Sequence, residues 1–279
     1  PPTLWAAVAP VLVGSALAVS ADVFAWDAFV VTLLAAVLIQ IGVNFANDVA
    51  DGTRGTDAAR IGPTRAVASG LITPRQMWKG IGWAFGLAAV AGVYLIKLAG
   101  PWILVIGVVS IVAALGYTNG PIPYGYYGLG ELFVFLFFGL VATVGSRFVF
   151  DRTLDPGAWA GGVAMGFLAS AILLANNVRD IDTDRDSGKR TLAVMAGRRN
   201  GVLLFALCVL GGILTPAISV VFDWLPTGAL LSLLALPVGL PLIRTLQRER
   251  SGPPLIKALK GTARLQLLVG LLLATGILI

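Results

Sequence analysis

The 279-residue sequence contains no histidine and a single cysteine, Cys208. Without histidine, neither Ser–His nor Cys–His nucleophilic catalysis is available to the chain, and a His-ligated zinc site is excluded. One cysteine cannot form an intrachain disulfide, and its position inside a long apolar stretch is typical of a residue that packs. Because the soft metal ligands are nearly absent, any metal site is expected to use oxygen atoms.

Charge is also scarce. Asp, Glu, Lys and Arg make up 12% of the chain, whereas 57% of it is hydrophobic. A soluble domain usually carries about twice that charged fraction. The apolar residues fall into blocks of roughly 17–22, close to the length that crosses a hydrocarbon core of ~30 Å. The composition therefore predicts a polytopic membrane protein rather than a soluble helical protein with a very large core.

The apolar blocks predict nine transmembrane helices, because lipid offers no hydrogen-bond partners to other open structures. Their approximate bounds are 4–20, 28–46, 77–97, 101–119, 129–149, 158–178, 200–222, 226–246 and 262–279. The first block is short, as in a signal peptide, but it has no basic leading region and no convincing cleavage site, so we interpret it as a span. We expect one all-α domain over 1–279, with the helices around a central cavity and a possible four-helix pseudo-repeat (about 4–119 and 129–246).

The positive charges follow topology, and the net charge of +6 does not indicate a nucleic-acid partner. Seventeen of the 20 lysines and arginines lie in or beside the connections after the second, sixth and eighth spans. These are Arg54, Arg60, Arg65, Arg75, Lys79, Arg179, Arg185, Lys189, Arg190, Arg198, Arg199, Arg244, Arg248, Arg250, Lys257, Lys260 and Arg264. The positive-inside rule puts these connections and the N-terminus in the cytoplasm, and the C-terminus outside.

The first of two acidic clusters follows the second span, in the stretch NFANDVADGTRGTD (44–57). Asn44 and Asp48 are four residues apart, and Asp48 and Asp51 are three apart, which puts all three on one face of a helix. Asp57 follows in the loop. Carboxylates at the end of a membrane span are costly, so they indicate a functional site rather than solvated salt bridges and helix caps.

The second cluster follows the sixth span, in NNVRDIDTDRDSGKRT (176–191). Asp180 and Asp184 repeat the four-residue spacing, and the same argument from cost favours a function for them. Asp182 and Asp186 fit solvated salt bridges better. We expect both clusters to lie in cytoplasmic loops on the same side of the membrane.

Carboxylate and amide oxygens are the ligands that Mg²⁺ prefers, and this ion usually completes its shell with water and phosphate oxygens. Basic residues lie in the same two loops, and guanidinium groups pair with phosphate through two hydrogen bonds. These residues are Arg54, Arg60, Arg65, Arg179, Lys189 and Arg190. Acids and bases together predict a site for a metal ion and a diphosphate.

The first motif resembles the Asn-x-x-x-Asp-x-x-Asp signature of the UbiA superfamily of intramembrane aromatic prenyltransferases, and NNVRDIDTDRDSGKRTLAV resembles its Asp-x-x-x-Asp signature. GPTRAVASGLIT, YTNGPIPYGYYGLGELFVFLFFGLVATVGSRFV and GKRTLAV are similar to the 1,4-dihydroxy-2-naphthoate prenyltransferases of menaquinone synthesis. The resemblance covers about residues 40–200. It implies transfer of a polyprenyl group from its diphosphate to that aromatic acceptor, with decarboxylation to demethylmenaquinone, in a prokaryotic plasma membrane.

By this resemblance, two Mg²⁺ ions would bind, one to Asn44, Asp48 and Asp51 and the other to Asp180 and Asp184. The four carboxylates would be catalytic, because bound cations stabilise the diphosphate as it leaves. Basic residues from both loops would grip the diphosphate; they are Arg60, Arg65, Arg179, Lys189 and Arg190.

Aromatic side chains would shelter the allylic cation from water and attract its charge. The candidates are Phe45, Tyr117, Tyr124, Phe133, Phe137 and Phe138, although plain packing or a place in the interfacial aromatic belt also explains most of them. Tyr117 is in addition the candidate for positioning the acceptor, whose own hydroxyl or carboxylate would replace a strong protein base. The polyprenyl chain also predicts contact with membrane lipid and a lateral opening between helices.

Three alternatives stay open. DVADG at 48–52 begins like the motif of CDP-alcohol phosphotransferases, but Gly55 and Thr56 stand where Ala and Arg should follow, and the next acidic pair comes much too late. An ion-coupled transporter would use the acids as ion ligands but should carry charges in the middle of several spans. Within the superfamily, the acceptor could instead be 4-hydroxybenzoate, homogentisate or a chlorophyll-type compound.

Overall fold

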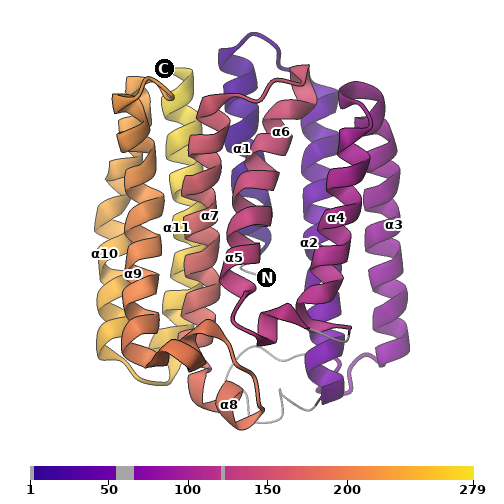
Figure 1. Cartoon of the computed structure of the whole chain (residues 1–279), viewed down its shortest axis with the longest axis vertical. Coiled ribbons are helices and arrows are strands. Elements are labelled where there is room, and N and C mark those ends of the chain that lie inside the picture. The colour runs from indigo at the N-terminus through magenta and orange to yellow at the C-terminus, as the bar shows by residue number, and fades with distance from the viewer. Residues whose placement is uncertain (1–2, 55–65, 121–122) are drawn as a thin grey trace.

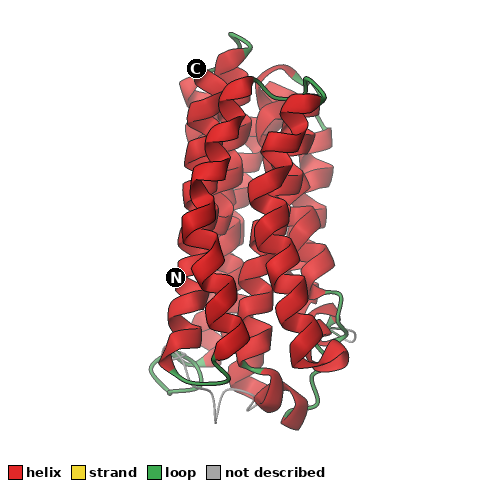
Figure 2. Ribbon diagram, turned by 90° about the vertical axis from the view of Figure 1, so that its left-hand side faces the viewer, coloured by secondary structure: helices red, strands yellow, loops and turns green. Residues whose placement is uncertain are grey.

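The computed structural model describes residues 3–54, 66–120 and 123–279, and helices running along one direction form nearly all of it (Figures 1 and 2). The helices are α1 Leu4–Ser20, α2 Trp26–Arg54, α3 Pro74–Ala99, α4 Trp102–Thr118, η1 Tyr124–Tyr126, α5 Gly130–Phe135, η2 Leu136–Val141, α6 Ala142–Asp151, α7 Pro156–Arg179, α8 Ile181–Asp186, α9 Leu192–Val221, η3 Thr227–Ala235, α10 Leu236–Arg248 and α11 Pro253–Leu278. No strand occurs among these residues. The predicted all-α fold is confirmed.

Seven helical segments of the described chain are long and apolar enough to cross a membrane. They are α2, α3, the continuous α5–η2–α6, α7, α9, the continuous η3–α10, and α11. α1 and α4 are apolar helices of 17 residues each, about 25 Å long at 1.5 Å per residue. The chain is therefore a multi-pass membrane protein, and the count of nine spans stays a prediction.

The seven tryptophans support this conclusion, because each has at least 42% of its surface exposed. Four of them, Trp26, Trp102, Trp159 and Trp224, lie near the helix starts at one end of the bundle. Trp78 lies in the first turns of α3, at the opposite end. Tryptophan is enriched at both membrane–water interfaces, where one part of the ring system meets lipid and the other meets water.

Helix starts carry the expected capping chemistry. Thr73 accepts a hydrogen bond from the backbone of Gln76, whose side chain accepts one back from the backbone of Thr73, and this capping box starts α3. Asp155 accepts from the first backbone amides of α7, next to Pro156 in its first turn. Thr191 caps α9 in the same way.

Several helices extend beyond the predicted apolar blocks. α2 continues to Arg54, so Asp48 and Asp51 of the first acidic cluster are still helical rather than part of a loop. The predicted loop 179–199 contains α8 and the first turns of α9, and α11 begins at Pro253 rather than at 262. Apolar composition marks where a helix lies in lipid, whereas the hydrogen-bonded helix can continue into the polar region.

The main core lies around α7, which packs against α9, α11, α1 and η2. Met165, Leu168, Phe205 and Leu265 are completely buried there. Glycines allow some of these helices to approach closely: a Cβ atom on Gly139 would collide with the backbone of α7. α2, α3 and α4 instead form smaller clusters of buried side chains with their neighbours, so the two halves of the bundle enclose a space between them.

Both acidic clusters lie at the same end of the bundle. The C-terminal part of α2 and α8 are at the bottom of Figure 1, and the C-terminus is at the top. At the end that contains the C-terminus, the buried Arg147 pairs with Asp151, at 2.5 Å between Nη1 and Oδ1, and lies 3.6 Å from Asp155. Arg147 thus lies at the opposite end of the bundle from the acidic clusters (Figure 1).

Candidate active site

A cavity of about 960 Å³ lies between the helices. Its walls come from α1, α2, α3, α4, α5–η2–α6, α7, α8 and α11. Along α2 the lining extends from Thr32 to Asp51, which is about 28 Å at the rise of a helix. The cavity is polar at the end with the acidic clusters and mainly apolar elsewhere, so it suits a long amphiphilic ligand.

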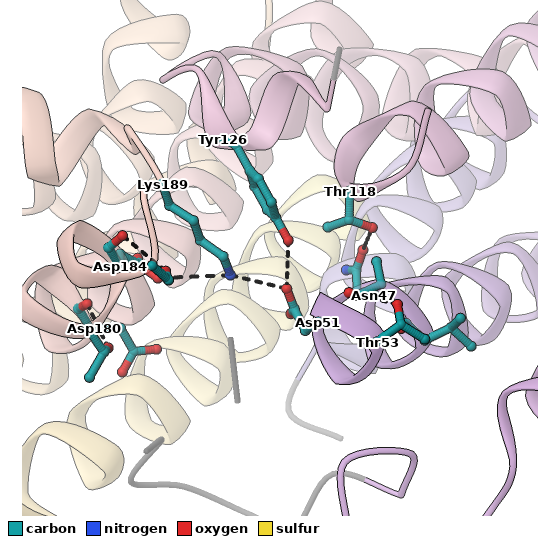
Figure 3. Close-up of polar contacts among 12 residues, drawn as sticks. Asn47, Asp51, Thr53, Thr118, Tyr126, Asp180, Asp184 and Lys189 are labelled. Atoms are coloured by element: carbon teal, nitrogen blue, oxygen red, sulfur yellow. Dashed lines mark hydrogen bonds and ion pairs between the residues drawn. The ribbon is translucent and has the colours of Figure 1, made fainter. Parts of the chain in front are cut away.

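The two acidic clusters meet through Lys189 (Figure 3). Its Nζ lies 3.0 Å from Oδ1 of Asp51, at the end of α2, and 3.9 Å from Oδ1 of Asp184, on α8. Tyr126 of η1 donates a hydrogen bond of 2.8 Å to the same oxygen of Asp51, and the Lys189 ammonium lies 4.7 Å from the centre of the Tyr126 ring. Segments far apart in the sequence thus form one charged cluster.

Lys189 is a cation in this cluster. Burial acts to lower the pKa of Lys189, but the charges of Asp51 and Asp184 and the interaction with Tyr126 outweigh it and raise the pKa above its usual value. The side chains of Lys189, Asp51 and Asp184 are only 14%, 10% and 13% exposed. The ammonium therefore offsets the repulsion between carboxylates from the two motifs.

The first carboxylate of each motif also faces the cavity. Asp48, one turn before Asp51 on α2, accepts hydrogen bonds from the backbone amides of Ala66 and Val67 at 3.2 and 3.1 Å. Asp180, at the end of α7, receives two hydrogen bonds from Arg179, from Nε at 2.6 Å and from Nη2 at 2.5 Å. All three of Asp48, Arg179 and Asp180 line the cavity.

Asn44 lies one turn deeper on α2 than Asp48 and also lines the cavity. Its Oδ1 accepts hydrogen bonds from Thr3 at 3.1 Å and from Gln40 at 3.5 Å. The first turn of α1 therefore joins the polar end of the cavity through Thr3.

The remaining predicted loop residues are not found at the cavity in the described part of the chain. Asp57, Arg60 and Arg65 lie outside the described residues. Arg190 is exposed, and the cavity lining, where the structure describes it, does not include its side chain. The backbone of Arg190 donates to the carbonyl of Tyr126, so its backbone is tied to the site while its side chain is directed elsewhere.

All six predicted aromatic wall residues line the cavity: Phe45, Tyr117, Tyr124, Phe133, Phe137 and Phe138. Four of them form a connected row. The ring centres are 5.5 Å apart for Tyr117 and Tyr124, 4.0 Å for Tyr124 and Phe133, and 6.1 Å for Phe133 and Phe137. The π-helical η2, which carries Phe137 and Phe138, is the kind of irregular turn often found at functional sites.

Part of the cavity lining comes from exposed apolar residues of α4. This helix packs against α2, α3 and η1, while α5–η2–α6 packs mainly against α7 and α1. Leu104 and Val108 of α4 line the cavity and are 54% and 52% exposed. Gly107 and Gly145, from the two sides, also line it, and a Cβ on either would meet nothing within 4 Å. We refer to the part of the cavity wall between α4 and α5–η2–α6 as the lateral slot.

Sequence reasoning missed several polar residues around the cavity. Tyr126 holds Asp51, and Thr118 of α4 donates to Asn47 at 3.0 Å (Figure 3). Glu131 is buried behind the wall, where it accepts a hydrogen bond of 2.9 Å from Asn177. The sequence does contain a signal for Glu131: a carboxylate inside an apolar block, here 129–149, is energetically costly and so indicates a specific role.

The carboxylates fit a hard cation such as Mg²⁺, because they are oxygen donors and Lys189 already occupies a cationic position between them. In the described parts of the chain, no group of three or more acidic or cysteine side chains has the geometry of a complete metal site. A phosphate-bearing ligand would have to supply the missing oxygens, as is usual for Mg²⁺.

Comparison with known proteins places this arrangement in a family context. Residues 7–272 match the model of the UbiA prenyltransferase family. The chain is 40% identical over 279 residues to the 1,4-dihydroxy-2-naphthoate octaprenyltransferase of Mycobacterium tuberculosis, with 100% of this chain and 94% of the relative covered. The apo structure of a UbiA homolog from Aeropyrum pernix K1 covers 99% of this chain and 96% of its own at 16% identity, with a TM-score of 0.74. A UbiA homolog from Archaeoglobus fulgidus bound to GPP and Mg²⁺ covers 99% and 97% at 14% identity, with a TM-score of 0.69.

Proposed function

The chain belongs to the UbiA prenyltransferase family, and we propose that it transfers a polyprenyl group from its diphosphate to 1,4-dihydroxy-2-naphthoate, with loss of carbon dioxide. The observation that carries the proposal is the charged cluster of Asp51, Lys189 and Asp184 at the polar end of a long apolar cavity. A diphosphate with a lipid tail has the same division into a highly charged head and an apolar chain.

The charged head would bind between α2 and α7–α8. Asn44, Asp48 and Asp51 would hold one Mg²⁺, and Asp180 and Asp184 a second. Bound Mg²⁺ would supply positive charge for the phosphate oxygens as the carbon–oxygen bond breaks. The solved homolog from Archaeoglobus fulgidus contains Mg²⁺ together with a prenyl diphosphate, GPP, which supports metal use here.

The basic residues would grip the same phosphate oxygens. Lys189 and Arg179 line the cavity, and on binding they would exchange their carboxylate partners for phosphate while the metal takes over the carboxylates. Arg60 and Arg65, in the loop after α2, are proposed to complete the grip. Cationic groups aimed at the leaving diphosphate in a dry site are the largest expected source of rate enhancement.

The reaction balances without a protein base. The prenyl carbon–oxygen bond breaks and its electron pair leaves with the diphosphate, while the prenyl carbon bonds to the ring carbon that carries the carboxylate. The bond from that ring carbon to the carboxylate then breaks, carbon dioxide leaves, and the electron pair restores the aromatic ring. No proton has to be removed from carbon, which fits a chain without histidine. Tyr117 would position the ring.

The apolar part of the site would protect the allylic cation and hold the prenyl tail. The row of aromatic rings from Tyr117 to Phe137 begins at the polar end of the cavity, where it would attract positive charge. The tail would enter from membrane lipid through the lateral slot. We propose that the acidic end faces the cytoplasm of a prokaryotic cell, because most lysines and arginines lie in its loops.

The test is incubation of the purified protein in detergent or lipid with a polyprenyl diphosphate, Mg²⁺ and one aromatic acid at a time. We expect 1,4-dihydroxy-2-naphthoate to give a product whose mass equals that of the acceptor carboxylate plus the prenyl group minus carbon dioxide. Preferred prenylation of 4-hydroxybenzoate or homogentisate would replace the acceptor but keep the reaction class. Release of no diphosphate with any acceptor would contradict the proposed function.

A further inference from the structure

One cationic side chain of the cavity wall has no anionic partner among the described residues. Arg179 pairs with Asp180, and Lys189 pairs with Asp51 and Asp184. Lys260, on α11, also lines the cavity, but within the part of the chain that the structure describes it forms no ion pair or side-chain hydrogen bond. It lies outside both acidic motifs, so the metal–diphosphate site does not account for it.

Lys260 stands on the α1 side of the cavity. The neighbouring Leu259 belongs to a cluster of buried side chains with Ala6 of α1 and Ile172 of α7. Leu259 and Ile256 line the cavity together with Lys260. The apolar part of this helical turn thus anchors α11 against α1, while the exposed Lys260 lines the cavity.

A second side chain on this side, Gln40, donates through Nε2 to Asn44 but has one polar atom without a partner. Gln40 of α2 is only 3% exposed and lines the cavity, and its Oε1 is buried without a hydrogen-bond partner in the described part of the chain. An unsatisfied amide oxygen in an apolar wall costs free energy unless a ligand supplies a donor. The first turn of α1 connects the two residues, because Thr3 binds Asn44 beside Gln40, while Ala6 packs near Leu259.

We propose that Lys260 and Gln40 form the acceptor subsite, which selects aromatic acids with a hydroxyl group next to the carboxylate. The ammonium of Lys260 pairs with the carboxylate, and Oε1 of Gln40 accepts a hydrogen bond from the adjacent hydroxyl. This inference rests on the proposed prenyl transfer, and it names the residues that recognise the acceptor. Neither residue touches the leaving diphosphate.

The chemistry of the reaction agrees with such a subsite. The carboxylate is present in the acceptor and leaves as neutral carbon dioxide, so the prenylated product no longer offers an anion to Lys260. The ion pair therefore favours binding of the substrate over that of the product, and its loss assists product release. An acceptor without a carboxylate gains nothing from Lys260.

The test compares Lys260→Ala with Lys257→Ala, a matched control on the same helix whose exposed side chain does not line the cavity. Two affinities are measured: KM for 1,4-dihydroxy-2-naphthoate, and competitive inhibition by naphthalene-1,4-diol, which lacks only the carboxylate. We expect Lys260→Ala to raise KM about tenfold, the usual effect of one lost charge-assisted hydrogen bond, and to leave inhibition by the diol and KM for the prenyl diphosphate unchanged. Lys260→Arg is expected to restore most of the affinity.

Gln40→Leu provides the second arm. It is expected to weaken binding of both the acid and the diol, because both compounds carry the hydroxyl. A raised KM for the prenyl diphosphate in Lys260→Ala would assign Lys260 to the diphosphate and overturn the subsite. Equal KM values for 1,4-dihydroxy-2-naphthoate in active Lys260→Ala and Lys257→Ala enzymes would also overturn the subsite. If the wild-type protein prenylates no aromatic acid at all, the proposed function itself is wrong.

Discussion

Replacing Lys189 with methionine tests whether this side chain substitutes for a bound cation. The substitution keeps most of the length of the side chain and removes its charge. In the absence of metal, it leaves the carboxylates of Asp51 and Asp184 without the ammonium that lies 3.0 and 3.9 Å from them. Tyr126 still donates to Asp51 but cannot neutralise it.

The structure sets the size of the effect. Removing one partner of a buried ion pair usually costs about 3–5 kcal/mol, because the remaining charge loses that partner. The three side chains are 10–14% exposed, so water reduces that cost, and we expect a loss of about 2–3 kcal/mol of stability. For a chain of this size this corresponds to a fall in Tm of roughly 3–5 °C.

The assay is thermal unfolding of the purified protein in detergent, once with a chelator and once with Mg²⁺. Because a divalent cation can replace the missing ammonium, we expect Mg²⁺ to raise the Tm of Lys189→Met by more than it raises that of the wild type. Prenyl transfer should still be impaired, since Lys189 is also proposed to grip the diphosphate. Lys79→Met is the control, because Lys79 is exposed at the same end and does not line the cavity.

Two results would refute the reasoning. If the variant and the wild type unfold at the same temperature in chelator, Lys189 does not hold the two acidic motifs together. If the variant is destabilised equally with and without Mg²⁺, the loss comes from packing and not from the cationic position.

Three further predictions concern catalysis and packing. Asp48→Ala and Asp180→Ala should each abolish prenyl transfer while the protein still inserts with unchanged helix content by circular dichroism; full activity in either variant would remove that residue from the site. EDTA should stop turnover and added Mg²⁺ should restore it, whereas an unchanged rate in chelator would count against metal. Gly228→Ala should destabilise the protein by about 1–3 kcal/mol, because its Cβ would collide with the backbone of Gly276; Gly82→Ala, where a Cβ meets nothing within 4 Å, should not, and equal stabilities would contradict this.

Much of the fold follows from composition, because the apolar blocks and the short polar or Gly- and Pro-containing segments between them determine which parts of the chain can lie in lipid. The described helices coincide with these blocks, but their ends do not. The predicted second span ended at residue 46, whereas α2 continues through Asp48 and Asp51 to Arg54. A polar helix end carries no apolar signal, so hydropathy alone places it in a loop.

The site was harder to predict in detail, because it depends on contacts between distant segments. Spacing within each motif indicated which acids share a face, but only the fold brings Lys189 between Asp51 and Asp184. Lys189 and Arg190 are neighbours in sequence, yet one lies in the cluster and the other is exposed. Gly188, at a φ of 78°, turns the chain just before them, and such a turn decides the direction of each side chain in a way that composition does not reveal.

If the prenyl tail enters through the lateral slot, as proposed, substrate concentration has a different meaning for this enzyme. A tail that enters and leaves between α4 and α5–η2–α6 never has to dissolve in water, so encounter takes place by diffusion in the plane of the leaflet. The relevant quantity is then the mole fraction of prenyl lipid in the membrane, and the aqueous concentration matters only for the soluble acceptor. Diluting the lipid substrate with inert detergent or phospholipid should slow turnover even when its total amount in the tube stays constant.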